Sequence, residues 1–187
     1  MATRRLHFER GNIYHVSNEG AHGAHIAHDE HDMATLATLL RGEAAAHHMR
    51  LLAWCVLPHS YQMLVQPLGT EPLHVFIQRV FNRYSKRFNH RYARSGTLFA
   101  GPFRAEWVVG ERTLALLCRH VHLLPVSTGC AAAPELWPHS DFAEWIDDTA
   151  CLRPLRHLDA TAYAQFVQAG ERRQPTTQIS QFVTTQA

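Results

Sequence analysis

The spacing of apolar residues changes along the chain in a fixed order, and this order constrains the fold most strongly. Residues 12–17 alternate and are rich in strand-forming side chains, so they predict a first strand. Asp29 or Asp32 can cap a helix whose apolar positions recur at helical spacing from Met33 to Gly42 or a few residues beyond. The chain is therefore expected to begin with a strand followed by a helix.

Two adjacent strands are predicted next. Residues 50–57 form a continuous apolar run, Pro58 and His59 interrupt it, and an apolar run resumes over residues 61–66. Because proline cannot donate a hydrogen bond to a central ladder, two strands joined by a tight turn fit this pattern best. A second helix is predicted over residues 73–89, with a proline in its first turn.

One more strand and one more helix complete the pattern. Residues 95–102 break regular structure, residues 103–109 alternate again, and a helix is predicted from Glu111 to about His122, ending before Pro125. The order is strand, helix, strand, strand, helix, strand, helix. This is the split βαβ pattern of an α+β ferredoxin-like sandwich.

The length and composition favour one globular domain with an appendage. The chain has 187 residues, of which 46% are hydrophobic and 18% charged. We expect a main domain over residues 1–130 and a C-terminal extension over residues 131–173 that packs on it, with a helix near residues 161–169. The Gln- and Thr-rich stretch of residues 174–187 is expected to be a disordered tail.

Membrane insertion and disulfide frameworks are not predicted. No run approaches the roughly 18 consecutive apolar residues of a membrane span, and the first residues lack the apolar segment of a signal peptide. A soluble, cytoplasmic protein is expected. The cysteines form no C-x-x-C pair, so neither a zinc knuckle nor a disulfide framework is indicated. Buried thiols are expected at Cys55, Cys118, Cys130 and Cys151.

Positive charge is concentrated in one window, although the formal net charge is only +2. No Asp or Glu occurs from Pro72 to Ala105, and such a local excess of cations suits a polyanionic partner. A solvated helix face usually also carries acids for i,i+4 pairing, so phosphate contact is the favoured interpretation. The candidate nucleic-acid-binding residues are Arg79, Arg83, Lys86, Arg87, Arg91, Arg94 and Arg104.

Several short stretches between residues 8 and 145 occur in an order that is typical of one family. They include Tyr14-His15-Val16-Ser17-Asn18, Val56-Leu57-Pro58, Phe81-Asn82-Arg83-Tyr84, Ser95-Gly96-Thr97-Leu98-Phe99, Phe103-Arg104-Ala105 and Trp137-Pro138. The ordered set resembles the REP-associated tyrosine transposases, a bacterial branch of the HUH single-strand transposases. The resemblance implies a ferredoxin-like fold and a partner that is single-stranded or hairpin DNA.

The resemblance also implies a defined chemistry. In the family, two histidines flank one residue on a central strand, so both imidazoles lie on one face and hold a divalent Mg or Mn ion. A tyrosine on a late helix then attacks the phosphorus and forms a covalent phosphotyrosine.

All three catalytic positions differ in this chain. Ser60 and Gln62 stand where the family has its metal-binding histidines, and His120 stands where it has the tyrosine. No intact catalytic site, metal site or cofactor is therefore expected. The leading hypothesis is a transposase-like, DNA-binding protein that is catalytically inactive.

Two alternatives remain open. One is an active metal-dependent DNA nickase or transposase that uses the displaced residues His59, His120 and His122 in DNA transposition. The other is a pseudoenzyme that acts as a protein-interaction partner, either as a homodimer or by pairing with an active relative.

Smaller features have two interpretations each. Tyr92 and Phe99 are candidates for stacking on unpaired bases, and burial of Phe99 in the core is the equal alternative. Four histidines recur every three residues and suggest a metal site, but a solvated loop is favoured because loop residues share no fixed face. These histidines are His22, His25, His28 and His31.

Two further comparisons with the family pattern concern loops. Glu19 and Gly23 stand where the family carries arginines, so the family's contacts with DNA are not predicted in this loop. Trp137, Pro138 and Trp145 resemble the family's C-terminal packing motif and are expected to cover the sheet or one of its ends.

Overall fold

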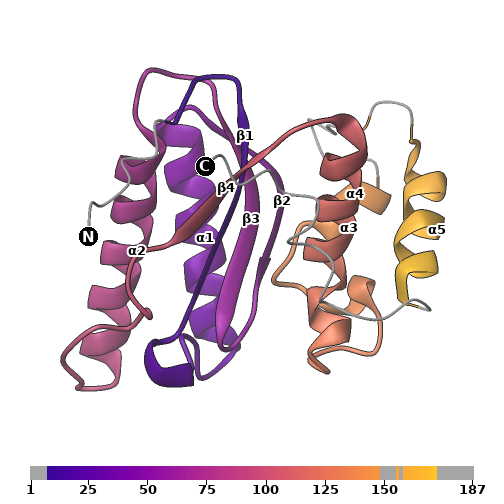
Figure 1. Cartoon of the computed structure of the whole chain (residues 1–187). Coiled ribbons are helices and arrows are strands. Elements are labelled where there is room, and N and C mark those ends of the chain that lie inside the picture. The colour runs from indigo at the N-terminus through magenta and orange to yellow at the C-terminus, as the bar shows by residue number, and fades with distance from the viewer. Residues whose placement is uncertain (1–7, 148–154, 156–157, 172–187) are drawn as a thin grey trace.

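A computed structural model describes residues 8–147, 155 and 158–171, which form a four-stranded sheet with helices on both faces (Figure 1). The strands are β1 (Ile13–Glu19), β2 (Met49–Val56), β3 (Ser60–Pro67) and β4 (Arg104–Val108). The helices are α1 (Glu30–Ala46), α2 (Leu73–Arg91), α3 (Glu111–Ser127), α4 (Phe142–Ile146) and α5 (Ala160–Glu171), with short 3-10 turns η1 (Ala21–Gly23) and η2 (Pro134–Leu136). In these residues no helix is long and apolar enough to cross a membrane.

The sheet has the strand order β2-β3-β1-β4, and every neighbouring pair is antiparallel. A tight turn joins β2 to β3, while α1 and α2 form the two crossover connections. The predicted α+β split βαβ sandwich is therefore confirmed. The division of the chain at residue 130 stays a prediction, and the expected tail lies outside the described residues.

One face of the sheet is covered by α1 and α2. Alternate residues of the two central strands point toward these helices, among them Val16 of β1 and Met63 of β3, which are both fully buried. Helix α2 meets them with Phe76, Val80 and other apolar side chains at helical spacing. This core holds the two helices against the sheet.

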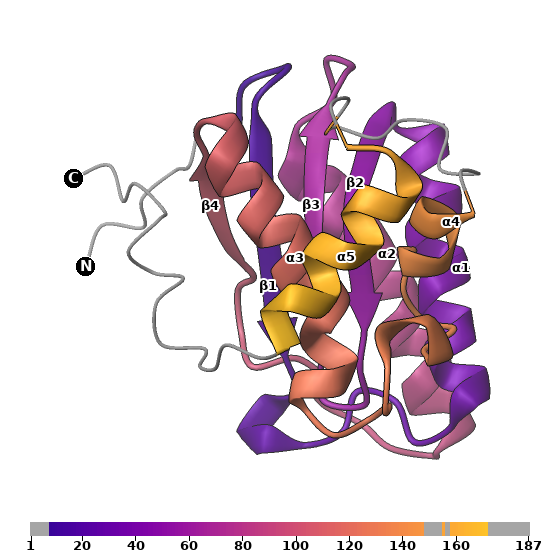
Figure 2. The ribbon, with the colours of Figure 1, turned by 90° about the vertical axis from the view of Figure 1, so that its right-hand side faces the viewer.

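The opposite face is covered by α3, with α4 and α5 packed beside it (Figure 2). Leu64 of β3 and Val121 of α3 are fully buried here, and Tyr163 of α5 joins the same cluster. The edge strand β2 contributes Trp54 and Val56 to the first core and Leu52 and Cys55 to the second, so it too is buried on both faces, which explains the apolar run that precedes Pro58.

The segment after η2 covers the edge strand β2. The Val56 amide donates to the His139 carbonyl at 2.8 Å, and the Asp141 amide donates to the Trp54 carbonyl at 3.3 Å. Trp137 adds a hydrogen bond from its indole to the Val56 carbonyl at 2.9 Å. An uncovered edge would present unpaired backbone groups to other chains. The predicted packing role of the Trp137 region is therefore confirmed.

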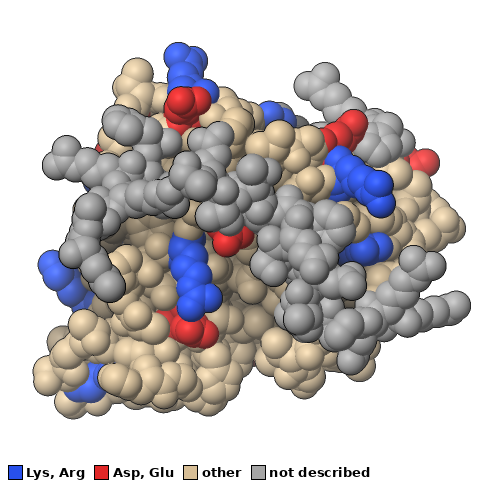
Figure 3. Space-filling model, viewed as in Figure 1, with Lys and Arg blue, Asp and Glu red and all other residues tan. Residues whose placement is uncertain are grey.

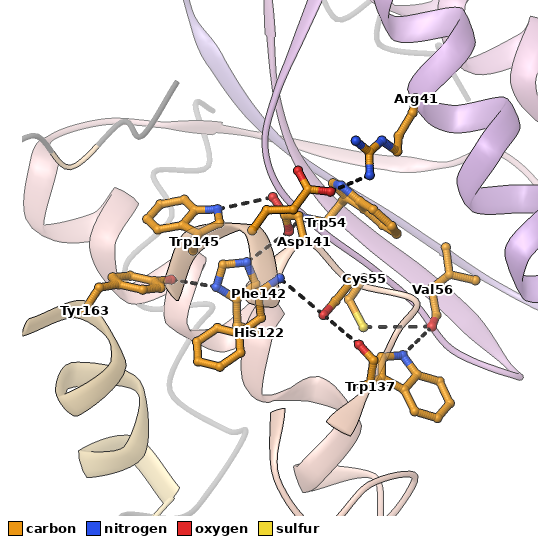
Figure 4. Close-up of polar contacts among 12 residues, drawn as sticks. Arg41, Trp54, Cys55, Val56, His122, Trp137, Asp141, Phe142, Trp145 and Tyr163 are labelled. Carbon is orange, nitrogen blue, oxygen red and sulfur yellow. Dashed lines mark hydrogen bonds and ion pairs between the residues drawn. The ribbon is translucent and has the colours of Figure 1, made fainter. Parts of the chain in front are cut away.

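A buried carboxylate joins this segment to α3 and β2 (Figure 4). Asp141 accepts hydrogen bonds from the Trp54 amide at 2.8 Å, from His122 Nε2 at 3.0 Å and from Trp145 Nε1 at 3.2 Å. The other nitrogen of the His122 ring lies 2.7 Å from the Tyr163 hydroxyl. Burial raises the pKa of Tyr163, so this hydroxyl stays protonated and can donate to Nδ1.

The predicted end of the third helix is wrong, because α3 continues through Pro125 to Ser127. Proline removes one helical donor and usually ends or kinks a helix. Here the last turn is held by other bonds: the Thr128 amide donates to the Leu124 carbonyl at 3.0 Å, and the Cys130 amide donates to the Pro125 carbonyl at 2.7 Å. Burial of Pro125 adds packing, so tertiary contacts outweigh the local signal. The sequence analysis also missed the short helix α4.

The cysteine prediction is confirmed for two of the four residues. Cys55 and Cys118 are fully buried free thiols, whereas Cys130 is only half-buried and Cys151 lies outside the described residues.

Removal of the buried carboxylate should strongly destabilise the fold. Asp141→Ala leaves three buried donors without their acceptor, and we expect a loss of about 3–5 kcal/mol in the free energy of unfolding. Urea titration followed by tryptophan fluorescence measures this loss. The exposed residue Asp147 provides the control, and Asp147→Ala should change stability by less than about 0.5 kcal/mol. Equal effects of the two substitutions would contradict the role of Asp141.

Candidate nucleic-acid interface and replaced catalytic positions

The three positions at which the resemblance predicts replaced catalytic residues, Ser60, Gln62 and His120, lie on the α3 side of the sheet or on α3 itself. Ser60 and Gln62 occupy one face of β3, and Gln62 pairs across the sheet with Ser17 of β1. The amide oxygen of Gln62 lies 3.2 Å from His120 Nε2 and 2.8 Å from Nε2 of His15, a β1 residue. The structure therefore places Gln62 and His120 in contact. His15, which the sequence did not indicate, contacts the same amide oxygen.

The bonding in this cluster sets the tautomers of both imidazoles. An amide oxygen only accepts hydrogen bonds, so each ring directs an Nε2–H group at Gln62. Burial, together with a smaller contribution from the nearby His15, lowers the pKa of His120 to about 4. Burial also lowers the pKa of His15, against opposing contributions from the Gln62 hydrogen bond and Glu106. Both rings are accordingly neutral near pH 7.

These residues do not fit the divalent ion that the family uses. Gln62 supplies an amide oxygen where an imidazole ligand is expected, and the Nε2 atoms of His15 and His120 are both engaged with this oxygen, so only their Nδ1 atoms keep a lone pair. Across the described part of the chain, no three His, Cys, Asp or Glu side chains are placed to hold a metal ion. We therefore assign no chemical step to a metal at this position.

The displaced histidines do not form a substitute site. His59 lies on the β2–β3 turn, where its ring contacts that of His25 at a centroid distance of 3.9 Å. His122 is fully buried in the Asp141 network, and His120 contacts Gln62 instead. Each of the three histidines has its own partners on a different part of the fold.

Several cations of α2 have acidic partners that the sequence pattern did not indicate. Arg83 pairs with Glu43 of α1, Arg79 approaches Glu71 at 3.4 Å, and Arg91 binds Asp29 at 2.6 Å and Asp32 at 2.5 Å. The hydrogen bond from Arg91 holds the pKa of Asp29 at about 2. The expectation that this helix face lacks acidic partners is wrong, because Glu71 lies just before α2 and the other acids come from α1 and the residue that caps it.

The remaining candidates are less constrained. Lys86 and Arg87 are exposed, and neither has an ion pair or hydrogen bond within the described residues. Arg104 lies 3.8 Å from Glu19, and its side chain is 79% exposed. Arg94 donates to the Thr97 carbonyl at 3.4 Å, and its guanidinium lies 5.5 Å from the centre of the Phe88 ring. Four cations thus remain available to a polyanion.

Two shallow grooves meet at Lys86. One runs along α2 beside Glu43 of α1, and the other lies where the start of α1 meets the end of α2. The second groove is lined by His31, Asp32, Thr35, Tyr84, Lys86, Arg87, Phe88, His90 and Arg91. In the view of Figure 3 the visible cations are scattered, and some of them lie next to acids. The two grooves, which bring several cations of α2 together, are the candidate interface.

The two aromatic candidates have partners within the protein. Phe99 is partly buried, and its ring meets the edges of Tyr61 and Phe81 at centroid distances of 5.8 and 5.1 Å. The hydroxyl of Tyr92 donates to Asp32 at 2.7 Å. Phe99 therefore packs against the core, as the second of its two interpretations predicted. Tyr92 lies partly exposed at the end of α2.

Sequence reasoning did not single out His15 as a site residue. It lies on the same face of β1 as Ser17, but its contact with Gln62 depends on the pairing of β1 with β3. Only a strand alignment across the intervening helix could have indicated this contact.

The neutral histidine cluster should make stability depend on pH. His120 has a pKa of about 4 in the folded protein, below its ordinary value of 6.5. The unfolded chain therefore takes up this proton first, so stability is complete above about pH 6.5 and falls toward pH 4, by up to about 1.4 kcal/mol per pH unit for one proton. Urea unfolding at several pH values measures the slope. The dependence of the free energy of unfolding on pH should be weaker in His120→Gln. It should be unchanged in His74→Gln, the control at an exposed site. An unchanged pH dependence in His120→Gln would contradict the role of His120.

Comparison of the sequence with known family models finds no match, and comparison with curated proteins finds none. Among solved structures, a REP-associated tyrosine transposase bound to a REP hairpin matches with a TM-score of 0.65 at 14% identity, covering 81% of this chain and 89% of that one. A Deinococcus radiodurans protein described as a putative transposase matches with a TM-score of 0.46 at 18% identity, covering 65% of this chain and 95% of that one. A bacterial tRNA(His) guanylyltransferase-like protein in complex with ATP also matches with a TM-score of 0.46 at 10% identity, covering 90% of this chain and 75% of that one. The chain has the fold of the REP-associated tyrosine transposase.

Proposed function

We propose that this protein binds single-stranded or hairpin DNA on a transposase-like scaffold and does not cleave it. The fold supports the proposal, because the structure that it matches over 81% of the chain is a transposase solved with a REP hairpin. Shared fold alone does not establish shared function, so the proposal also needs a suitable surface.

The observation that carries the proposal is the pair Lys86 and Arg87. Both are exposed on α2 with no ion pair among the described residues, and both line the groove at the end of this helix. Lysine and arginine side chains in such a position can bind phosphates without first breaking an internal bond. Arg94 and Arg104 extend this set toward the loop of residues 95–101.

The paired arginines have a secondary role in the proposal. Arg79 and Arg83 remain 53% and 56% exposed, so each can offer further N–H groups to a phosphate while an acid holds its guanidinium. The acids lower the local positive potential, and they also restrict the arginine side chains. We therefore expect modest affinity with defined geometry.

The absence of cleavage is proposed from the chemistry of the replaced positions. Gln62 and His120 form a hydrogen-bonded cluster whose imidazoles are neutral and direct N–H groups at an amide oxygen. A glutamine cannot replace an imidazole ligand, and no tyrosine stands at the position of the nucleophile. We accordingly propose that DNA binding needs no divalent ion.

Binding should weaken steeply with salt. If about five phosphates are contacted, the logarithm of the affinity should fall with the logarithm of the salt concentration at a slope of about −3.5 for single-stranded phosphates and about −4.5 for phosphates of the duplex stem. Fluorescence anisotropy with a labelled DNA hairpin measures this slope. A flat salt response, or no binding at low salt, would contradict the proposal.

Reversal of the two unpaired charges should reduce the affinity. The double variant Lys86→Glu with Arg87→Glu should bind the hairpin at least about tenfold more weakly at moderate salt. The matched control is Arg10→Glu with Arg112→Glu, which makes the same change in net charge at exposed positions that belong neither to α2 nor to its two grooves. An equal loss in both double variants would show that net charge, rather than this surface, determines binding.

Cleavage is tested with the same hairpin in the presence of Mn²⁺. We expect neither a nick nor a covalent protein–DNA adduct on a denaturing gel, while an active tyrosine transposase produces both. Chelation of divalent ions should leave the affinity of this protein unchanged. A nick that the chelator abolishes would instead support the metal-dependent alternative.

A further inference from the structure

Five aromatic rings form a continuous row at the end of the sheet where α2 ends. We call this row the ring ladder, and it consists of His59, His25, His28, Phe88 and Tyr92. His59 contacts His25 at a centroid distance of 3.9 Å, and His25 stacks on His28 at 5.8 Å. His28 lies 5.1 Å from Phe88 and 4.7 Å from Tyr92. The row thus runs from the β2–β3 turn to the end of α2.

The outer part of the ring ladder faces solvent. His25, His28 and His59 are all exposed, whereas Phe88 is buried beneath them. The solvated loop that the sequence favoured for His25 and His28 is confirmed, because both are exposed. Their rings also contact one another, His59 and α2, so three exposed imidazole rings lie together at the surface.

Backbone hydrogen bonds hold the loop that carries His25 and His28. The Ile26 and Ala27 amides donate to the Pro58 carbonyl at 2.7 and 3.1 Å, which fixes the loop to the β2–β3 turn. The Tyr84 hydroxyl donates to the Ile26 carbonyl at 2.6 Å, which fixes the same loop to α2. The rings are therefore arranged before any partner binds, which lowers the entropic cost of binding.

Metal binding does not explain the cluster. The rings meet face to face or edge to face, and within the described residues no three ligands are placed to hold a metal ion. A purely structural role is also weak, because exposed rings contribute less to stability than buried ones. A ligand with flat rings of its own is the better match.

Cations border the ring ladder on the α2 side. The Arg91 guanidinium lies 5.1 Å from the centre of the Tyr92 ring, and that of Arg94 lies 5.5 Å from the centre of Phe88. Phe88 also lines the groove that contains Lys86 and Arg87. A partner with negative charges next to flat rings would therefore meet cations and aromatic faces side by side.

We propose that the ring ladder is a stacking platform for unpaired bases of a DNA strand whose phosphates lie along the Lys86 groove. This inference rests on the proposed DNA binding. It adds that the ring ladder binds the unpaired bases, while the groove binds the phosphates. Histidine rings stack on bases, and such stacking tolerates any sequence because every base has a π-face. The platform would favour a hairpin with a single-stranded flank over a blunt hairpin.

The test compares two DNA probes. One is a blunt hairpin, and the other is the same hairpin with a short thymine-rich flank that contains 2-aminopurine. The flank should raise the affinity roughly tenfold, as expected for a stacked base, and binding should quench the 2-aminopurine fluorescence.

Variants of the central ring sharpen the test. His25→Ala should remove both the gain in affinity from the flank and the quenching, with the affinity for the blunt hairpin unchanged. His25→Phe retains a ring and should retain both effects. The control His74→Ala removes an exposed imidazole at the start of α2, away from the ring ladder, and should behave as the wild-type protein does.

Three outcomes would overturn this inference. If the wild-type protein binds both probes equally, the platform is wrong while DNA binding stands. If His25→Ala weakens the binding of both probes alike, the ring ladder supports the loop rather than the bases. If neither probe binds at low salt, the proposed function fails together with this inference.

Discussion

The antiparallel pairing of β1 with β3 is the constraint on which the rest of the structure depends. Side chains alternate along a strand, so one register places Val16 beside Met63 under α1 and α2 and directs His15 and Gln62 to the other face. A slip by one residue would exchange the two faces and bury polar groups in an apolar core. The same pairing therefore creates both the core and the polar cluster at the replaced catalytic positions.

The polar cluster is stable because its members satisfy one another. Gln62 accepts from two imidazoles, and burial keeps both imidazoles neutral. The second polar network, around Asp141, is different because it places a carboxylate among three donors in the interior. Both networks use histidines of α3, yet His122 ties the C-terminal segment to the sheet, whereas His120 contacts Gln62 of β3.

Charge on the surface of α2 shows how packing changes the meaning of a sequence pattern. Arg79, Arg83 and Arg91 lie in a window without acids, but Glu71 just before α2 pairs with Arg79, and α1 with its N-cap supplies the partners of Arg83 and Arg91. The side chains of Lys86 and Arg87 form no ion pair within the described part of the chain. The available positive surface is therefore smaller than the sequence indicated, and it is concentrated next to the ring ladder.

The sequence by itself determined the order of strands and helices, since apolar periodicity and turn residues act locally, and it led to the prediction of replaced catalytic residues at Ser60, Gln62 and His120. Only the tertiary structure decided which residues meet: His15 with Gln62, His25 with His59, and the arginines with their acids. It also decided that α3 passes through Pro125, because burial and capping bonds from the following residues outweigh the local preference of proline. Periodicity reports which face of an element is buried, whereas contacts between distant segments depend on strand order and helix packing, which no local pattern contains.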